Sequence, residues 1–338
     1  MQTSRKLWMA AICTVAMMTG VTSVRAQQTN LLPPDSELVV TINFQQIMKS
    51  EVVKANKAIL DIAKGKIDEQ LDEKGLAKYL KKAGFDVFRD LSTITISIPA
   101  DRNPEEGFVL LEGTFDAEKI EAAFTDASKD AGGGLKIVMI GNAKAFEVSP
   151  KGEKSMLVGI LNKKTLIACL TKKDFGDAVA RSGAKGAGKF KSETVTNLLQ
   201  TVTAKQSISF VATSKVLGKL AENAPEGAPQ AKMAVEAIKQ MDGFSAAITI
   251  QKDIDVQLGL NMKDADTANK TAAGINFAIT LFKGKVDDMA KGDEKAKVLA
   301  DVMNTLRASS KGPNIVINAR LTFENLGKLL QSLPLPNN

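Results

Sequence analysis

Hydrophobic and polar positions alternate with a period of two in several segments of the chain, which is typical of β-strands with one buried face. The clearest case is 92–99, where three isoleucines alternate with hydroxyl residues before Pro99. Similar alternation or short β-rich runs predict strands at 37–43, 108–115, 207–212, 244–250, 254–262 and 315–323. Four short runs centred on Val138, Phe146, Val158 and Ala168 predict an antiparallel meander.

Other segments repeat apolar residues every three or four positions, the period of an amphipathic helix. This pattern predicts helices within 44–83, 116–131, 173–180 and 193–202, and after Phe323. The longest begins near Asp264, whose carboxylate can cap its first turn. We expect its apolar stripe to lie in the core, together with that of the following helix: Ile275, Ile279, Phe282, Val286 and Met289, then Leu299, Val302 and Leu306.

These elements predict an α+β fold with two related halves, each a mainly antiparallel sheet packed against helices. Both halves share one order of elements, and 94–124 corresponds best to 248–277. An internal duplication would give a first unit at 27–182 and a second at 193–338, joined by a small-residue linker at 183–192. Residue identity between the halves is poor, so a coincidental order of elements is the alternative.

The N-terminus has the pattern of a secretory signal. Arg5 and Lys6 precede the apolar run Leu7–Val21, and Val24 and Ala26 supply small residues before a cleavage point. We predict a signal peptide over 1–26. The apolar run has 15 residues, whereas a membrane span needs about 20, so an uncleaved anchor is the weaker alternative. The exported protein is expected to be soluble, in the periplasm or outside a bacterial cell.

Composition narrows the chemistry that such a protein can perform. The 338 residues are 44% hydrophobic and 25% charged, as in an ordinary globular protein, but they include no histidine. Ser-His-acid catalysis is therefore excluded, and zinc sites lose their usual ligands. The remaining possibility for an enzyme is a hydrolase that uses a Ser-Lys dyad or paired carboxylates. No residue stands out for that role, so we assign no catalytic, cofactor-binding or metal-binding residue and expect no cofactor.

Individual motifs do not indicate a specific catalytic or binding function either. Cys169, the single cysteine outside the predicted signal, is flanked by apolar residues, which favours a buried core thiol. The acidic pairs 105–106 and 287–288 lack the spacing of a calcium loop and are expected to be solvated. Residues 183–190 match Gly-x4-Gly-Lys of a phosphate-binding loop, but Phe190 stands where a hydroxyl is required and a helical pattern precedes the match. We interpret this segment as a linker.

Charge argues against nucleic acid as a partner. Three of the 45 basic residues and none of the 38 acidic ones lie within the first 26 residues, which leaves 42 − 38 = +4 after cleavage. The lysines occur in scattered pairs, without the basic stripe and aromatic residues that nucleic-acid binding needs. Membrane association is expected only if the signal stays uncleaved.

The start of the predicted mature chain carries a resemblance. Residues 32–43 (LPPDSELVVTIN) and 47–53 (IMKSEVV) resemble the start of uncharacterised exported proteins of planctomycete-type bacteria. This resemblance implies export and a repeated α+β architecture, and it implies no activity.

The sequence therefore favours an exported, non-catalytic protein with a structural or binding role in the cell envelope, whose partner would be an envelope protein or an apolar ligand. One alternative is a carrier or chaperone of a lipid or apolar peptide, which would need an apolar space between the helix 264–289 and a sheet. The second alternative is the hydrolase without histidine.

Overall fold

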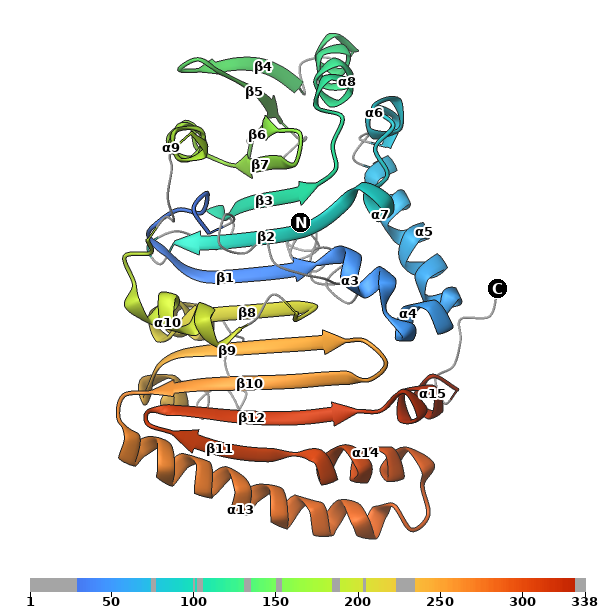
Figure 1. Cartoon of the computed structure of the whole chain (residues 1–338), viewed down its shortest axis with the longest axis vertical. Helices are drawn as coiled ribbons and strands as arrows, with labels where there is room; N and C mark the ends of the chain where they lie inside the picture. The colour runs from blue at the N-terminus through green and yellow to red at the C-terminus, as the bar shows by residue number, and fades with distance from the viewer. Residues whose placement is uncertain are drawn as a thin grey trace.

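The computed structural model describes residues 29–331 except 74–76, 100, 102–105, 131–134, 150–153, 184–188, 203–204 and 223–234. Helices surround a large antiparallel sheet, so the α+β prediction is confirmed (Figure 1). The predicted signal peptide and the centre of the predicted linker lie outside the described residues. In the part of the chain that is described, none of the helices has the length and apolar character of a membrane-spanning segment.

One sheet contains all twelve strands of the described residues, in the order β11-β12-β10-β9-β8-β1-β2-β3-β7-β6-β5-β4. The strands are β1 (Ser36–Asn43), β2 (Leu91–Pro99), β3 (Phe108–Gly113), β4 (Leu135–Ile140), β5 (Ala143–Val148), β6 (Met156–Asn162), β7 (Thr165–Cys169), β8 (Ile208–Thr213), β9 (Met241–Ile250), β10 (Ile254–Met262), β11 (Arg307–Lys311) and β12 (Asn314–Leu321). Strands of the two predicted halves meet where β1 pairs with β8, so both halves share this sheet.

The helices are α3 (Phe44–Lys49), α4 (Glu51–Ala55), α5 (Lys57–Glu73), α6 (Ala77–Lys82), α7 (Val87–Asp90), α8 (Ala117–Asp130), α9 (Lys172–Ser182), α10 (Glu193–Thr201), α11 (Ser214–Glu222), α13 (Ala265–Met289), α14 (Glu294–Thr305) and α15 (Phe323–Gln331). The cap expected at Asp264 is confirmed, and Asp116 caps α8 in the same way. Asp116 accepts a hydrogen bond from the Lys119 amide (3.1 Å), and Asp264 accepts one from the Thr267 amide (2.7 Å). Each cap satisfies an amide that has no partner within its helix.

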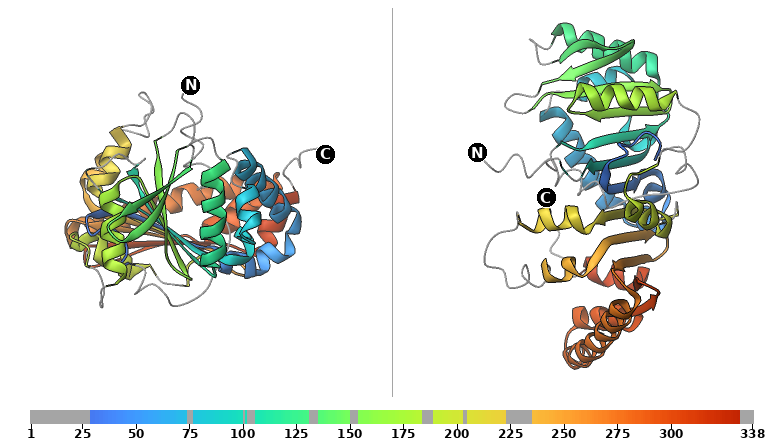
Figure 2. Two further views of the ribbon diagram at one scale, coloured as in Figure 1. Left: turned by 90° about the horizontal axis from the view of Figure 1, so that it is seen from above. Right: turned by 90° about the vertical axis from the view of Figure 1, so that its left-hand side faces the viewer.

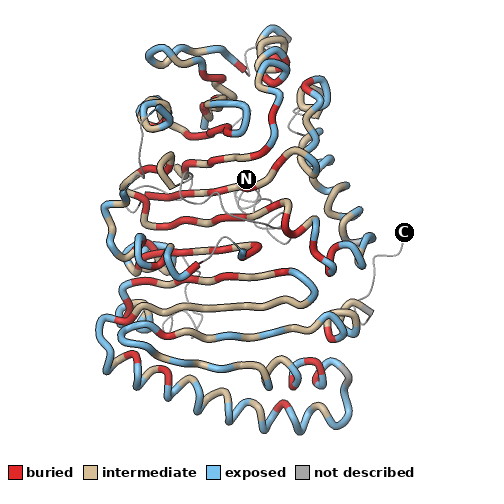
Figure 3. Tube along the Cα trace, viewed as in Figure 1, coloured by how far each residue is buried: buried red, intermediate tan, exposed pale blue. Residues whose placement is uncertain are grey.

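Helices cover both faces of the sheet (Figure 2). On one face, α9 and α10 contribute Phe175 and Leu198 to a core with Leu110 and Ile167. On the opposite face, α3 and α4 pack near Ile42 at the end of β1, and α8 packs on the same flank of the sheet. The helix α11 packs through Val216 near Leu38, at the start of β1. Buried residues are concentrated in the central strands and are sparse in α13 (Figure 3).

The expectation of a single buried face is wrong for β2. Thr93, Thr95 and Ser97 are buried, whereas Ile94 and Ile96 on the other face are half-buried. The reason is that Thr95 lies opposite Leu110, on the face that packs against the core with Phe175 and Leu198, whereas Ile96 lies on the less covered face. Alternation along a strand cannot distinguish a covered polar face from a solvated one.

The expected burial of α13 is only partly correct. Val286 is buried and Ile275 and Ile279 are half-buried, but Phe282 and Met289 are 60% and 63% exposed. In Figure 1, α13 runs along the end of the sheet beyond β11, so only one side of the helix has a neighbour.

Burial of α14 also differs from the expectation. Leu299 is exposed, and Val302 and Leu306 are half-buried. The small residues Ala296 and Ala300 of the same helix are buried, whereas Leu299 is not. A helix at the end of the sheet does not need its largest apolar residues to fill a core, so periodicity alone does not fix which side faces inward.

The internal duplication stays a prediction, but the sheet order is compatible with it. On either side of the β1–β8 pair lie the hairpins β2–β3 and β9–β10, and each hairpin leads into a helix capped by aspartate. The later strands β7 and β12 then return to pair with β3 and β10. The halves differ in the additional hairpin β4–β5 of the first and the helix α14 of the second.

Candidate functional site

The register of the sheet places an apolar residue of every strand in a continuous row across one face. We call it the central row. From β4 to β11 it consists of Ile137, Phe146, Val158, Ala168, Val109, Ile96, Val40, Phe210, Ala246, Leu258, Ile317 and Ala308. Because side chains on a strand alternate between faces, all twelve project from the same side.

The central row is less buried than its position in the sheet would suggest. From Val109 on β3 to Ala308 on β11, each of its residues is half-buried. On β1 and β8 the neighbours Leu38, Ile42 and Ala212 are buried, because α11 packs on Leu38 and Ala212, and α3 and α4 pack on Ile42. On β9 and β10 the neighbours, such as Phe244 and Leu260, are half-buried like the row itself. Helices therefore cover the flanks of this face at β1 and β8, and the face is partly accessible further along the sheet.

This surface can bind by apolar contact. The residues on either side of the row in β1 and β8 are also apolar, and the rings of Phe210 and Phe244 lie 5.9 Å apart between their centroids. Burial of such surface is favourable by about 25 cal/mol per Å². With aliphatic and aromatic side chains alone, the row has no group that could transfer a proton or attack a substrate.

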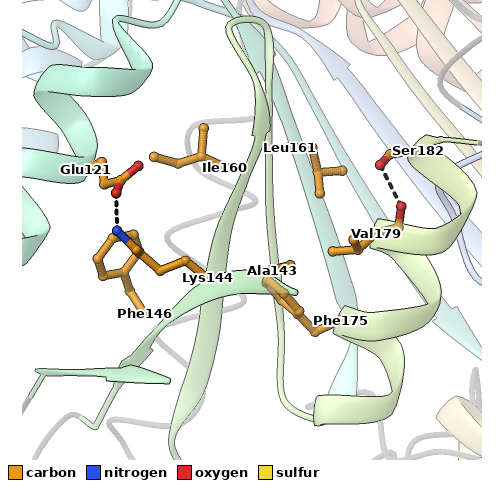
Figure 4. Close-up of a pocket in the computed structure, with 9 residues that line it drawn as sticks. All are labelled: Glu121, Ala143, Lys144, Phe146, Ile160, Leu161, Phe175, Val179 and Ser182. Carbon is orange, nitrogen blue, oxygen red and sulfur yellow. Dashed lines mark hydrogen bonds and ion pairs between the residues drawn. The ribbon is translucent and has the colours of Figure 1, made fainter. Parts of the chain in front are cut away.

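A cavity of about 200 Å³ lies at the meander, between α8 and α9 (Figure 4). It holds a serine and a lysine, the pair required by the hydrolase alternative. The Lys144 ammonium is ion-paired with Glu121, and the Ser182 hydroxyl donates to the Val179 carbonyl at 2.7 Å. Figure 4 shows Lys144 and Ser182 on opposite sides of the cavity. They do not form a nucleophile-base pair, which needs direct hydrogen-bonding distance.

A larger surface pocket of about 570 Å³ lies beside α7 and the start of α8. Its charged groups form ion pairs, Arg89 with Asp90 at 2.7 Å and Lys119 with Asp116 at 3.0 Å. The hydrogen bond from Arg89 holds the pKa of Asp90 below its usual value. These contacts fasten helix termini, and exposed pairs of this kind contribute little to stability.

Glu112 is a titratable residue that the sequence analysis missed. It lies on β3, opposite Thr93 on one side and Thr165 on the other, on the face away from the central row. Burial raises the pKa of its carboxyl to about 8. A shifted pKa can mark a functional group, but these two cross-strand neighbours are threonines, whose hydroxyls do not titrate in the physiological range. Its signal in the sequence was a single acid within the apolar run Phe108–Gly113.

The structure places the other residues considered from the sequence as follows. Cys169 is 2% exposed in the core, and its thiol donates weakly to the Thr171 carbonyl at 3.6 Å. Asp288 is exposed and paired with Lys291 at 2.7 Å. The centre of the phosphate-loop-like segment lies outside the described residues, and Phe190 at its end packs against the core. Within the described ranges, no group of three or more His, Cys, Asp or Glu side chains could hold a metal ion.

Comparisons with known proteins assign no family. No protein-family model and no curated protein matches the chain. Among solved structures, crystal form I of TP0453, a spirochete protein, is 11% identical with a TM-score of 0.45, over 92% of this chain and 98% of that chain. Crystal form IV of the same protein is 9% identical with a TM-score of 0.47, over 90% and 96% of the two chains.

Proposed function

We propose that this chain is an exported, non-catalytic binding protein of the bacterial envelope that holds a lipid acyl chain against the central row. The observation that carries the proposal is the half-buried state of that row from Val109 to Ala308, on a face whose flanks are covered by helices at β1 and β8. Export rests on the N-terminal pattern at 1–26, and the resemblance to planctomycete-type proteins has the same implication.

The size of the row suits an extended acyl chain. Its half-buried part crosses eight strands, from β3 to β11. At about 4.8 Å between strands this distance is about 34 Å, close to the ~30 Å thickness of a bilayer's hydrocarbon core. A single acyl chain, which spans half of that core, fits within the row. The ligand would lie across the strands in contact with aliphatic and aromatic side chains.

We favour this function, which is a form of the carrier alternative, over a purely structural role and over the hydrolase. A purely structural protein would be expected to cover the middle of an apolar sheet face as fully as its flanks. The hydrolase alternative requires a nucleophile beside a base, and Ser182 and Lys144 in the meander cavity do not satisfy it. The carrier alternative placed the ligand beside helix 264–289, whereas the proposed site lies on the sheet itself.

A tryptophan reporter can test this proposal directly. Trp8, the single tryptophan of the chain, lies within the predicted signal, so the exported protein would contain none. Phe210→Trp places a reporter in the central row, and Phe88→Trp places one at a half-buried phenylalanine on α7. Titration with a brominated fatty acid should quench the indole fluorescence of the Phe210→Trp variant in a saturable manner and leave that of the Phe88→Trp variant unchanged.

Native mass spectrometry of the unmodified exported protein gives an independent readout, since a bound lipid would add a discrete mass. Ala246→Phe should reduce binding at least tenfold because the larger ring occupies the middle of the row. Equal quenching of both reporters, or no bound lipid together with no quenching, would refute the proposal. A copurified apolar peptide in place of a lipid would refute the assigned ligand class.

A further inference from the structure

The helix α13 exposes its large apolar side chains. Phe277, Leu281, Phe282 and Met289 are 66%, 56%, 60% and 63% exposed. Its buried side is formed mainly by small residues, Ala268 and Ala272, and by Val286. This arrangement is the reverse of an ordinary amphipathic helix, in which the largest apolar residues face the core. Clustered exposed apolar residues mark an interaction surface.

Hydrogen bonds to the edge of the sheet fix the orientation of α13. The Asn276 side chain donates to the Ala308 carbonyl of β11 at 2.9 Å and accepts from the Ala308 amide at 3.2 Å. The Ser310 hydroxyl also bonds to Asn269 at 2.7 Å. These polar residues lie on the sheet side of the helix, so the exposed apolar residues are held outward. At 100° per residue they occupy an arc of about 140°.

Charge around this arc indicates what it contacts. The helix carries three lysines, Lys270, Lys283 and Lys285, and three aspartates, which lie in its first and last turns at 266, 287 and 288. Lys270 and Lys285 fall within the exposed arc itself. Asp288 also falls within this arc, and the ion pair with Lys291 at 2.7 Å offsets its charge. Apolar side chains bordered by lysines on a surface helix are suited to the interface of a bilayer with anionic headgroups.

We propose that α13 is a membrane-docking helix that lies flat on an anionic lipid surface, with Phe277, Leu281 and Phe282 inserted between the headgroups. Its 25 residues form a rod about 37 Å long at the end of the sheet beyond β11, where none of the other described elements obstructs a flat surface (Figures 1 and 2). The proposal is independent of the ligand on the central row, and it goes beyond the sequence expectation that only an uncleaved signal would bring the protein to a membrane.

Vesicle co-sedimentation of the exported full chain tests the docking surface. Vesicles of phosphatidylcholine with about 30% phosphatidylglycerol should bind the protein, and binding should weaken as salt is raised. Phe277→Ser with Phe282→Ser should reduce the partition coefficient at least tenfold. The control is Met139→Ser on β4, which removes a side chain that is 61% exposed at the opposite end of the sheet and should leave binding unchanged.

A second pair of variants tests the charge contribution. Lys270→Gln with Lys285→Gln should weaken binding to the anionic vesicles, whereas Lys163→Gln with Lys164→Gln, the same charge change in the β6–β7 turn, should not. Absence of vesicle binding by the unmodified protein, or equal loss in the control variants, would overturn the proposal. A dimer in sedimentation velocity that dissociates on Phe277→Ser would overturn it as well, because it would assign the surface to a second copy of the chain.

Discussion

Glu112 provides the sharpest test of the physical reasoning, because it places a carboxyl group inside the sheet. Burial raises its pKa from 4.5 to about 8, so the folded protein keeps the side chain neutral at pH 7. In the unfolded chain the same group ionises near its ordinary value. The two states therefore bind different numbers of protons between these pH values, and Glu112→Gln removes the difference while keeping a similar shape.

The sign and size of the effect follow from linkage. Below about pH 4.5 the carboxyl is neutral in both states. Between pH 4.5 and 8 it ionises only in the unfolded chain, so stability falls as pH rises, by about 1.4 kcal/mol per pH unit. The full difference of about 3.5 units corresponds to about 5 kcal/mol. This is a large part of the 5–15 kcal/mol that typically stabilises a protein.

Urea unfolding followed by circular dichroism at pH 5, 6, 7 and 8 measures the effect. Relative to the unmodified protein, Glu112→Gln should gain about 3.5 kcal/mol of unfolding free energy between pH 5 and pH 8. Glu121→Gln makes the same chemical change in an exposed ion pair on α8 and controls for the substitution itself. A difference between Glu112→Gln and the unmodified protein that stays constant within about 1 kcal/mol over this range would refute the reasoning.

The remaining predictions concern local packing and capping. Asp264→Ala removes the cap of α13 and should lower the unfolding free energy by about 1 kcal/mol in urea titrations. Gly159→Ala should cost about 1–3 kcal/mol in the same assay, because the added Cβ would lie 2.3 Å from the ring of Phe175. Gly65→Ala on α5 meets nothing within 4 Å and should be neutral or stabilising. Cys169 should react with a thiol reagent only as fast as the protein unfolds, which labelling rates measured in increasing urea would show.

Local sequence features predicted most of the elements. The alternation in 254–262 and the β-rich run at 37–43 became β10 and β1 with bounds within one residue. Asp116 and Asp264 marked the starts of α8 and α13, because a cap depends only on residues within one helical turn. The candidate site was not predictable in the same way, since the central row requires the pairing register of twelve strands that are distant in sequence.

The sequence by itself determined the α+β class, the positions of most strands and helices, though not of β11, and the absence of histidine-dependent chemistry, because these follow from composition and from interactions between near neighbours. Only the tertiary structure decided that β1 pairs with β8 to join both halves in one sheet, that the Phe282 ring points to solvent, and that the Glu112 carboxyl is largely shielded from solvent. The periodicity of apolar residues indicates that a helix or strand has an apolar side and a polar side. Which of these sides is buried depends on the segments that pack against it. That choice is made by contacts between segments far apart in the chain, and it leaves the central row and the outer arc of α13 open for binding.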